Sequence, residues 1–349
     1  MIIFAATRAE VVVTDEEFQR LLATIGSLTS LQVVRLDAVV RSRLTGGAVG
    51  LQDAVEPVAS TATATTSTDG CASIADIEAH FAASPQCPHC QTGKLTKWGF
   101  ANGLRRYRCK PCKVTFNCLT GTPLAQLHKR DLWGGHAQAL VDGISLRKVA
   151  ERINVDLTTA FRWRHRFLRT PKSLKPRVLK GTVEADETFF LYSEKGREQH
   201  DRAPRKRGGK ASQRGLSAEQ VPVLIARDHH KATTDQILPN RSAASIGAVL
   251  EPILDRSSIL VSDAAAAYGA FANKINVVHV ALNLSAGERT WGTYHIQNVN
   301  NYCSRLKNWM RRFNGVATKY LASYLGWHRQ IDRWGSTLSA RSTLFAAWG

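Results

Sequence analysis

The stretch that most constrains the fold is GTVEADETFFLYS, residues 181–193, which places three acids in a strand-like sequence. Its β-branched, aromatic and apolar side chains predict a buried β-strand. Side chains alternate along a strand, so Glu184 and Asp186 share one face while Glu187 points to the other. Buried carboxylates are costly unless a cation meets them. The cation is either an Arg or Lys of the chain or a metal ion on Asp186. A second and a third acid or amide placed downstream on matching elements would favour the metal ion.

The charge balance of the chain indicates its partners. The 349 residues exceed what one compact core usually holds, so we expect two or three domains. Lys and Arg total 47 against 28 Asp and Glu, a formal charge of +19. Such an excess favours nucleic acid as the partner, with an anionic membrane surface second. No apolar run of about 18 residues predicts a membrane span, and the early charges of the opening ten residues do not suit a signal peptide.

The N-terminal part carries no recognisable chemistry. Residues 1–54 are predicted to form a helical appendage, with Thr14 as a plausible N-cap of the first helix. Residues 55–72 are rich in Ser, Thr and Ala without a periodic apolar face, and they predict a flexible linker.

Two cysteine pairs mark the next unit, residues 73–125, which opens with a short helix at about 73–83. Eighteen residues separate Cys87-Pro-His-Cys90 from Cys109-Lys-Pro-Cys112, a spacing typical of a four-cysteine zinc site. The residues between read as a hairpin that turns at Asn102-Gly103. Four thiolates leave no open position on Zn²⁺, so the ion would be structural. The alternatives are four reduced, packed cysteines or a redox pair.

Cations and aromatic rings alternate between the two cysteine pairs. This mixture suits a surface laid against phosphates, and a solvated basic hairpin is the alternative. The residues concerned are Lys94, Lys97, Arg105, Arg106 and Arg108, with Trp98, Phe100 and Tyr107.

Residues 126–170 contain the pattern of a helix-turn-helix. Apolar positions from 144 to 153 mark one helix, 154–156 make a tight turn, and 158–168 continue as a second helix that would enter a major groove. A plain helical hairpin is the alternative. Pro171 and Pro176 are expected to end helical structure at a domain boundary. The residues predicted to face DNA are Thr158, Thr159, Arg162, Arg164 and His165, with Phe161, Trp163 and Phe167 in the core.

The last domain alternates strands and helices. Residues 195–215 hold eight Lys or Arg against two acids and predict a mobile basic loop, which includes Arg205, Lys206 and Arg207. Further strands are expected at 221–228, 231–238, 257–263 and 276–282, with a helix at 243–254. Asp263 falls at a strand's C-terminal end, where sites of α/β sheets gather. Asn300 and Lys307 are seven residues apart on a helix that opens at His295, and so share one face.

This order resembles the ribonuclease H-like fold, and the residues resemble the ISXO-like insertion-sequence transposases, a DDE-type family. The resemblance lies in the cysteine ribbon, VEADETFF around Asp186, SDAAAAY around Asp263 and HIQNVNNYCSRLK around Asn300 and Lys307. It implies a zinc ribbon joined to a mixed-sheet catalytic domain. With the helix-turn-helix between them, we expect an α/β chain with the catalytic domain at 178–335 and a C-terminal tail at 336–349. The family has Glu or Asn at its third metal-facing position, and this chain has the Asn form.

The resemblance implies cleavage of transposon ends and strand transfer with Mg²⁺ or Mn²⁺. Asp186 would bridge two ions, Asp263 would bind one, and Asn300 would bind the other through its amide oxygen. Lys307 would hold a DNA phosphate, and His295 would position the scissile strand. The expected partners are double-stranded DNA and further copies of the chain, with no membrane. The expected location is the bacterial cytoplasm, at the nucleoid.

Two other functions are compatible with the sequence. An inactive or domesticated DNA-binding regulator would use the same ribbon, helix-turn-helix and basic loop, and Asn300 is a weaker ligand than a carboxylate unless Glu184 or Glu288 helps. Asn300 could alternatively be a helix N-terminal cap. A structure-specific nuclease without strand transfer is the third possibility.

Overall fold

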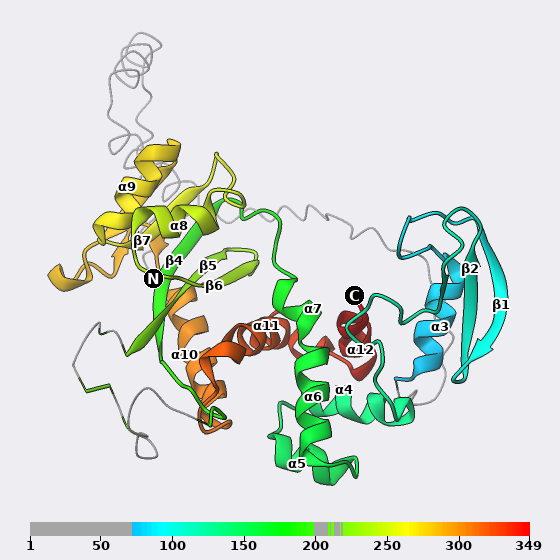
Figure 1. Ribbon diagram of the computed structural model, residues 1–349. Helices are drawn as coiled ribbons and strands as arrows, with labels where there is room; N and C mark the ends of the chain where they lie inside the picture. The colour runs from blue at the N-terminus through cyan, green and yellow to red at the C-terminus, as the bar shows by residue number, and fades with distance from the viewer. Residues whose placement is uncertain (1–71, 199–208, 210, 213–216, 218) are drawn as a thin grey trace, which may run out of the picture.

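The computed structural model describes residues 72–198, 209, 211–212, 217 and 219–349 (Figure 1). The predicted appendage at 1–54, nearly all of the predicted linker at 55–72, and the basic residues Arg205, Lys206 and Arg207 lie outside the described residues. Within the described part of the chain, no helix is both long and apolar enough to cross a membrane.

The cysteine-rich unit forms a small three-stranded sheet against one helix. The turn of its first hairpin holds Asn102 at φ 51° and Gly103 at φ 75°, the left-handed pair that a tight hairpin requires. The predicted hairpin and its turn are therefore confirmed. The elements are α3 (Ile74–Ala83), β1 (Leu95–Ala101), β2 (Leu104–Cys109) and β3 (Thr115–Phe116).

A group of helices follows, and it contains the predicted helix pair. Asn154 adopts φ 49° between the two helices, and the pair is confirmed. Pro171 was predicted to end helical structure, and this is wrong, because it lies in the first turn of a short helix, where backbone N–H groups have no helical acceptor. The elements are η1 (Arg130–Leu132), α4 (Trp133–Val141), α5 (Leu146–Arg152), α6 (Leu157–Phe167) and α7 (Arg169–Ser173).

The five-stranded sheet has the order β6-β5-β4-β7-β8. Its first three strands in the chain pair antiparallel as a meander, whereas β7 and β8 join parallel to β4 and to each other. This mixed order is that of the ribonuclease H-like fold, and the predicted fold class is confirmed. The strands are β4 (Thr182–Leu191), β5 (Gln220–Asp228), β6 (Thr233–Ile237), β7 (Ile259–Asp263) and β8 (Val278–Leu282).

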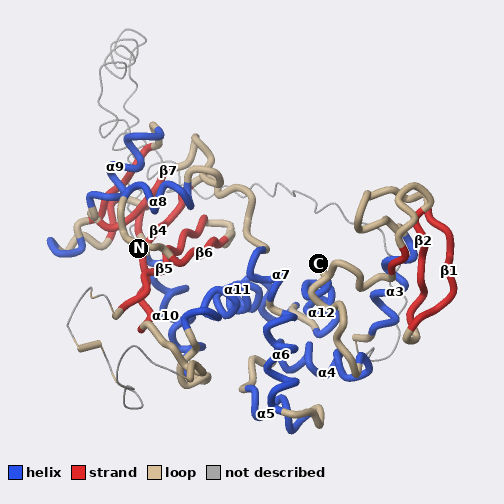
Figure 2. Tube along the Cα trace, in the orientation of Figure 1, coloured by secondary structure: helices blue, strands red, loops and turns tan. Residues whose placement is uncertain are grey.

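Helices cover both faces of this sheet (Figures 1 and 2). One face buries Val183 and Ala185 of β4 under α8 (Ala243–Leu250) and α9 (Ala266–Ile275). The opposite face packs against α10 (Gln297–Arg311) and α11 (Thr318–Trp334). A short turn and hairpin lead into α10, namely η2 (Leu284–Ala286), β9 (Thr290–Trp291) and β10 (Tyr294–His295).

The segment predicted as a C-terminal tail contains a packed helix, α12 (Ala340–Trp348), which follows η3 (Gly335–Thr337). The indole Nε1 of Trp348 donates to the carbonyl oxygen of Cys118 at 2.7 Å, and Phe345 meets His80 of α3 edge to face. In Figure 1, α12 lies between the sheet domain and the cysteine-rich unit, beside α4. The end of the chain thus packs back onto the unit that opens the described chain.

Helix α11 packs against both the sheet domain, at β6, and the helix α7 that precedes this domain. The buried guanidinium of Arg329 pairs with the buried carboxylate of Asp235 on β6. The same guanidinium donates to the carbonyl oxygens of Pro171 at 2.9 Å and Leu174 at 3.0 Å. At Gly326 the helix passes so close that an added Cβ would lie 2.7 Å from the Cα of Lys172. Only glycine permits this approach.

Gly326→Ala should destabilise the protein by roughly 1–3 kcal/mol, because the new methyl group meets rigid backbone. Thermal or denaturant unfolding of the full chain measures the change. The matched control is Gly269→Ala in α9, where a Cβ would be 3.9 Å from its nearest neighbour and alanine should add up to about 1 kcal/mol as the better helix former. Equal effects of the two substitutions would contradict the close-contact account.

Candidate active site and metal centre

The three acids of β4 have three different surroundings, and Glu187 is the most fully neutralised. Its carboxylate accepts a 2.7 Å hydrogen bond from the hydroxyl of Tyr268 and lies 3.2 Å from Nε of Arg241. This acid points to the α8–α9 face, opposite the other two, as the strand alternation predicted. A cation of the chain meets it, so Glu187 has a structural role.

Glu184 is buried on the opposite face, where it caps the start of α10. Its carboxylate accepts from the backbone N–H of Val299 at 2.9 Å and from Nδ2 of Asn298 at 2.6 Å. Nδ1 of His295 lies 3.3 Å away. Free N–H groups at a helix N-terminus and the helix dipole favour such a carboxylate. Sequence reasoning missed this contact, since 114 positions separate Glu184 from Asn298.

Asp186 shares the face of Glu184 but has no close cation. Among the described residues, no Lys, Arg or His nitrogen lies within 4.0 Å of its carboxylate, which accepts one hydrogen bond, from the backbone N–H of Glu187 at 2.8 Å. Burial raises the pKa of Asp186 to about 6, the negative charge of Asp263 adds to the rise, and Lys307 opposes it. The carboxylate is thus held in an unfavourable charged state at neutral pH.

Asp263 lies beside Asp186 because of the sheet register. The parallel pairing of β4 with β7 matches Glu184 to Val261, and the same offset carried two residues further matches Asp186 to Asp263. Val261 belongs to the apolar cluster under α10, so alternation turns Asp263 to that same face. Asp263 ends its strand, and its Oδ1 accepts from the backbone N–H of Ala265 at 3.2 Å.

Helix α10 supplies the remaining predicted residues of the site. Burial raises the pKa of the Cys303 thiol to about 12, the charge of Asp186 adds to this, and the charge of Lys307 opposes it, so both charges act on this part of α10. Asn300 lies one turn before Cys303, next to Val299, whose N–H reaches Glu184. Asn300 and Lys307 are exposed and flank Cys303 on one helix face. Their predicted roles in metal and phosphate binding remain predictions.

This donor set fits a divalent cation. Two carboxylates on adjacent strands repel each other, and the amide of Asn300, the predicted third ligand, would add a neutral oxygen, the donor type that Mg²⁺ and Mn²⁺ prefer. Glu184 was considered as a helper of the second ion, but its carboxylate is taken up by the start of α10. Glu288 is exposed and accepts from the backbone N–H of Asn283 at 3.1 Å.

The four predicted cysteines come together at the base of the hairpin. Their sulfur atoms all lie within 4.8 Å of one another, and the closest contacts are 3.6 Å for Cys87 with Cys112 and 3.4 Å for Cys90 with Cys109. Tetrahedral thiolates about 2.3 Å from one ion would be separated by such distances. The cluster can hold a metal ion.

The hairpin presents part of the predicted basic and aromatic surface. Trp98 and Phe100 are 46% and 63% exposed, with the guanidinium of Arg108 4.7 Å from the first ring and that of Arg105 4.0 Å from the second. Arg106 is half-buried and donates to the hydroxyl of Thr115 at 3.1 Å. Tyr107 was predicted to belong to this surface, and this is wrong, because its side chain is buried and stacks on Phe116 beneath the hairpin.

Two residues on the second helix of the pair differ in exposure from the prediction. Arg164, predicted as a surface cation facing DNA, is only 1% exposed, and Phe161, predicted to lie in the core, is 37% exposed. The reason is α11, which packs on α6 from the other end of the chain and buries Arg164 between Phe313 and Trp327. Thr158 and Arg162 are exposed and Thr159 is half-buried, whereas His165 is half-buried and stacks on Tyr320.

Asp186→Asn should stabilise the protein at neutral pH without added metal. The folded pKa of about 6 exceeds the usual 3.8, so stability falls as pH rises between these values, by at most about 3 kcal/mol. Removing the charge should therefore recover the free energy of unfolding that is lost when Asp186 ionises. Thermal unfolding at pH 5 and pH 7.5 measures it, with the exposed Asp131→Asn as the control, expected to change stability by less than about 0.5 kcal/mol. A less stable Asp186→Asn at pH 7.5 would contradict the unpaired state of this carboxylate.

Comparison with known proteins finds several similar chains. A curated relative, an uncharacterized protein in transposable element ISH50 of Halobacterium salinarum, is 29% identical over 251 residues, which are 68% of this chain and 82% of the relative. Among solved structures, the simian T-cell lymphotropic virus intasome with a PP2A regulatory subunit is 10% identical with a TM-score of 0.26, over 55% of this chain and 66% of that one. The Mos1 transposase paired-end complex is 15% identical with a TM-score of 0.22, over 58% and 76%.

Both structural scores are low, so the fold assignment rests on strand order and register. The family comparison is more specific, because the ISXO2-like transposase domain matches residues 178–327. This range contains Asp186, Asp263, Asn300 and Lys307. The resemblance predicted from the sequence is confirmed, because residues 178–327 match the ISXO2-like transposase domain and the curated relative comes from a transposable element.

Proposed function

We propose that the protein binds the terminal inverted repeats of its element and catalyses metal-dependent DNA cleavage and strand transfer. The observation that carries this proposal is the pair of acids on adjacent strands, Asp186 and Asp263. Burial raises the pKa of Asp186, in the middle of β4, and the charge of Asp263 at the end of β7 adds to the rise. Strongly shifted groups of this kind mark candidate functional sites.

The residues of the site have distinct proposed roles. Asp186, Asp263 and Asn300 would hold Mg²⁺ or Mn²⁺, which when bound activates a water or a 3′-hydroxyl and stabilises the leaving oxygen. Lys307 would bind a phosphate beside Asp186, and its charge already acts on that carboxylate. His295 would orient the scissile strand from its position beside Glu184.

Double-stranded DNA would contact surfaces outside the site. The exposed rings of the hairpin, with Arg105 and Arg106 nearby, would lie against phosphates, and Arg162 on α6 would contribute a further cation. The cysteine cluster would hold structural Zn²⁺ that fixes the hairpin. Two transposon ends processed together require at least two copies of the chain, so we expect a homo-oligomer on DNA.

Asp263→Ala and Asn300→Ala should each reduce cleavage of end DNA by about 100-fold or more, because even outer-shell partners of a metal cost 10- to 100-fold. Binding to the same DNA should persist. A gel assay of strand cleavage with Mn²⁺, beside a binding assay without divalent metal, measures both. Asn308→Ala is the control, since Asn308 is an exposed asparagine of the same helix, on a different face from Asn300.

Unchanged cleavage by Asn300→Ala would remove this residue from the proposed site. The second candidate function is the inactive DNA-binding regulator, favoured by the neutral Asn at a position where a carboxylate would bind metal more strongly. A wild-type protein that binds the flanking DNA but neither cleaves nor moves it would establish that function. Cleavage without joining would indicate the nuclease.

Purified protein should contain about one zinc per chain, as expected for a single four-cysteine site. Cys109→Ala should lose the metal and lower the stability of the hairpin unit, as elemental analysis and thermal unfolding would show. Cys118→Ala is the matched control, since Cys118 is also buried but lies outside the cluster. Zinc retained at full occupancy by Cys109→Ala would contradict the assignment.

A further inference from the structure

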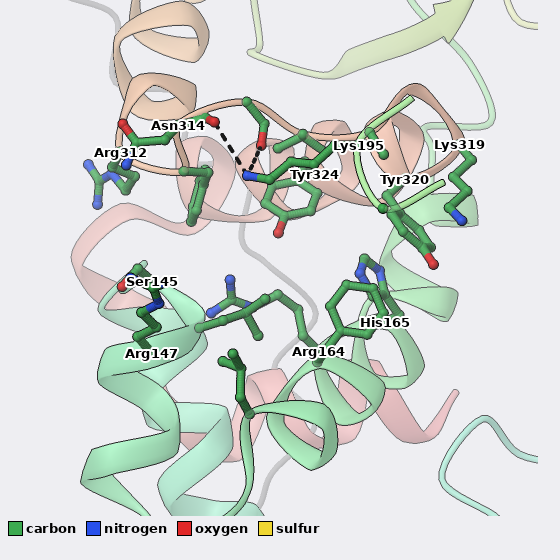
Figure 3. Close-up of a pocket in the computed structure, with 18 of the residues that line it drawn as sticks. Ser145, Arg147, Arg164, His165, Lys195, Arg312, Asn314, Lys319, Tyr320 and Tyr324 are labelled. Atoms are coloured by element: carbon green, nitrogen blue, oxygen red, sulfur yellow. Dashed lines mark hydrogen bonds between the residues drawn. The ribbon is translucent and has the colours of Figure 1, made fainter. Parts of the chain in front are cut away.

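A cleft of about 820 Å³ lies between the helix pair and the sheet domain (Figure 3). Helices α5 and α6 form one wall, and the opposite wall consists of α11, the turn before it and the segment that follows β4. The backbone N–H of Ser193, in the segment after β4, donates to the hydroxyl of Thr318 at the start of α11 at 2.9 Å. Nζ of Lys195 reaches the carbonyl oxygens of Asn314 and Gly315 at 3.4 and 3.2 Å.

The cleft is strongly basic. None of the described residues that line it is acidic, which leaves the lining with a high positive charge. Five of its lining residues are Lys or Arg, namely Arg147, Arg164, Lys195, Arg312 and Lys319. Such one-signed clefts concentrate an anionic ligand.

Arg164 is the most informative of these cations. It is 1% exposed, and its terminal nitrogen donates to the carbonyl oxygen of Ile144 at 2.7 Å. Its Nε is buried without a hydrogen-bond partner, and no carboxylate of the described residues lies within 4.0 Å of it. A buried guanidinium without a counter-charge is costly, and an anion bound in the cleft would relieve that cost.

Aromatic rings line the cleft beside these cations. His165 stacks on Tyr320 with ring centroids 3.9 Å apart, and Phe161 meets the two rings edge-on at 4.5 and 5.4 Å. Burial lowers the pKa of His165 to about 4, with the charges of Arg164 and Lys319 assisting, so this ring is neutral at physiological pH. We name Phe161, His165 and Tyr320 the aromatic shelf.

We propose that this cleft binds one unpaired nucleotide of a DNA strand, with its phosphate among the cations and its base on the aromatic shelf. Cations with stacking rings are the means by which proteins hold single-stranded nucleic acid. The volume of about 820 Å³ falls in the range of about 300–1,000 Å³ for small-ligand sites, which suits one nucleotide. This proposal names a second DNA contact of the function proposed above and assumes that function.

Tyr320→Ala should weaken binding to a duplex with a short single-stranded extension by about 10-fold, since a stacked base contributes roughly 1–3 kcal/mol. Binding to the matching blunt duplex should hardly change. Fluorescence anisotropy with the full chain, without divalent metal, measures both. The matched control is Trp334→Ala, an exposed ring at the other end of α11 that, like Tyr320, has a cation over it.

Two further variants separate loss of binding from loss of folding. Tyr320→Phe keeps the ring and should keep the binding. Arg147→Ala removes an exposed cation of the cleft and should weaken binding to the extended DNA alone, whereas Lys148→Ala, its exposed neighbour outside the cleft, should not. Equal losses on blunt and extended DNA, or none for Tyr320→Ala, would overturn the proposal.

A competition experiment distinguishes a nucleotide within a DNA strand from a free nucleotide as the ligand of the cleft. A free deoxynucleoside monophosphate should displace the extended DNA only weakly, and displacement at the concentration at which the oligonucleotide itself competes would overturn the DNA-strand assignment. Asp186→Asn should retain full binding to the extended DNA. The binding preference can therefore fail while cleavage succeeds, or hold while cleavage fails, so the two proposals are tested separately.

Discussion

The arrangement of the domains depends on one buried cation, Arg329. Its guanidinium has to find acceptors because it cannot lose its proton, and it finds them on two domains: the carboxylate of Asp235 in the sheet and the carbonyl oxygens of Pro171 and Leu174 in the connecting segment. Removing any one partner would leave a buried charge incompletely paired. Gly326 lets α11 approach closely enough for these bonds to form. These contacts fix the position of the helix pair relative to the sheet. The cleft between them is therefore defined by the packing of the domains.

The central strand shows how one sequence can use acids for opposite purposes. Glu187 and Glu184 are paired with Arg241 and with the start of α10, so they stabilise the packing on the two faces of the sheet. Asp186, between them in the sequence, is denied a close cation and lowers the stability of the folded chain. Glu184 also positions α10, and through it the face that bears Asn300 and Lys307, against Asp186. The charge of Asp186 thus destabilises the folded chain, whereas the paired carboxylates of Glu184 and Glu187 stabilise it.

The sequence predicted what depends on local pattern. Cysteine spacing, the turn at Asn102, the strand alternation at Asp186 and the strand end at Asp263 all follow from a few consecutive residues, and the structure contains each of them. Contacts between distant segments could not be predicted in this way. From the local sequence, Arg164 is predicted to be a surface cation. Its burial depends on α11, which begins at Thr318, and the residues near position 164 do not predict that distant contact. The capping of α10 by Glu184 and the packing of α12 on α4 were missed for the same reason.

The strand that carries Asp186 continues into the wall of the cleft at Lys195. Nine residue steps separate Asp186 from Lys195, and the last four lie beyond the end of β4 at Leu191, so the two residues are at most about 30 Å apart. One short stretch of chain therefore links the proposed metal site to the proposed nucleotide site, and a DNA strand that occupied both would follow this side of the sheet domain.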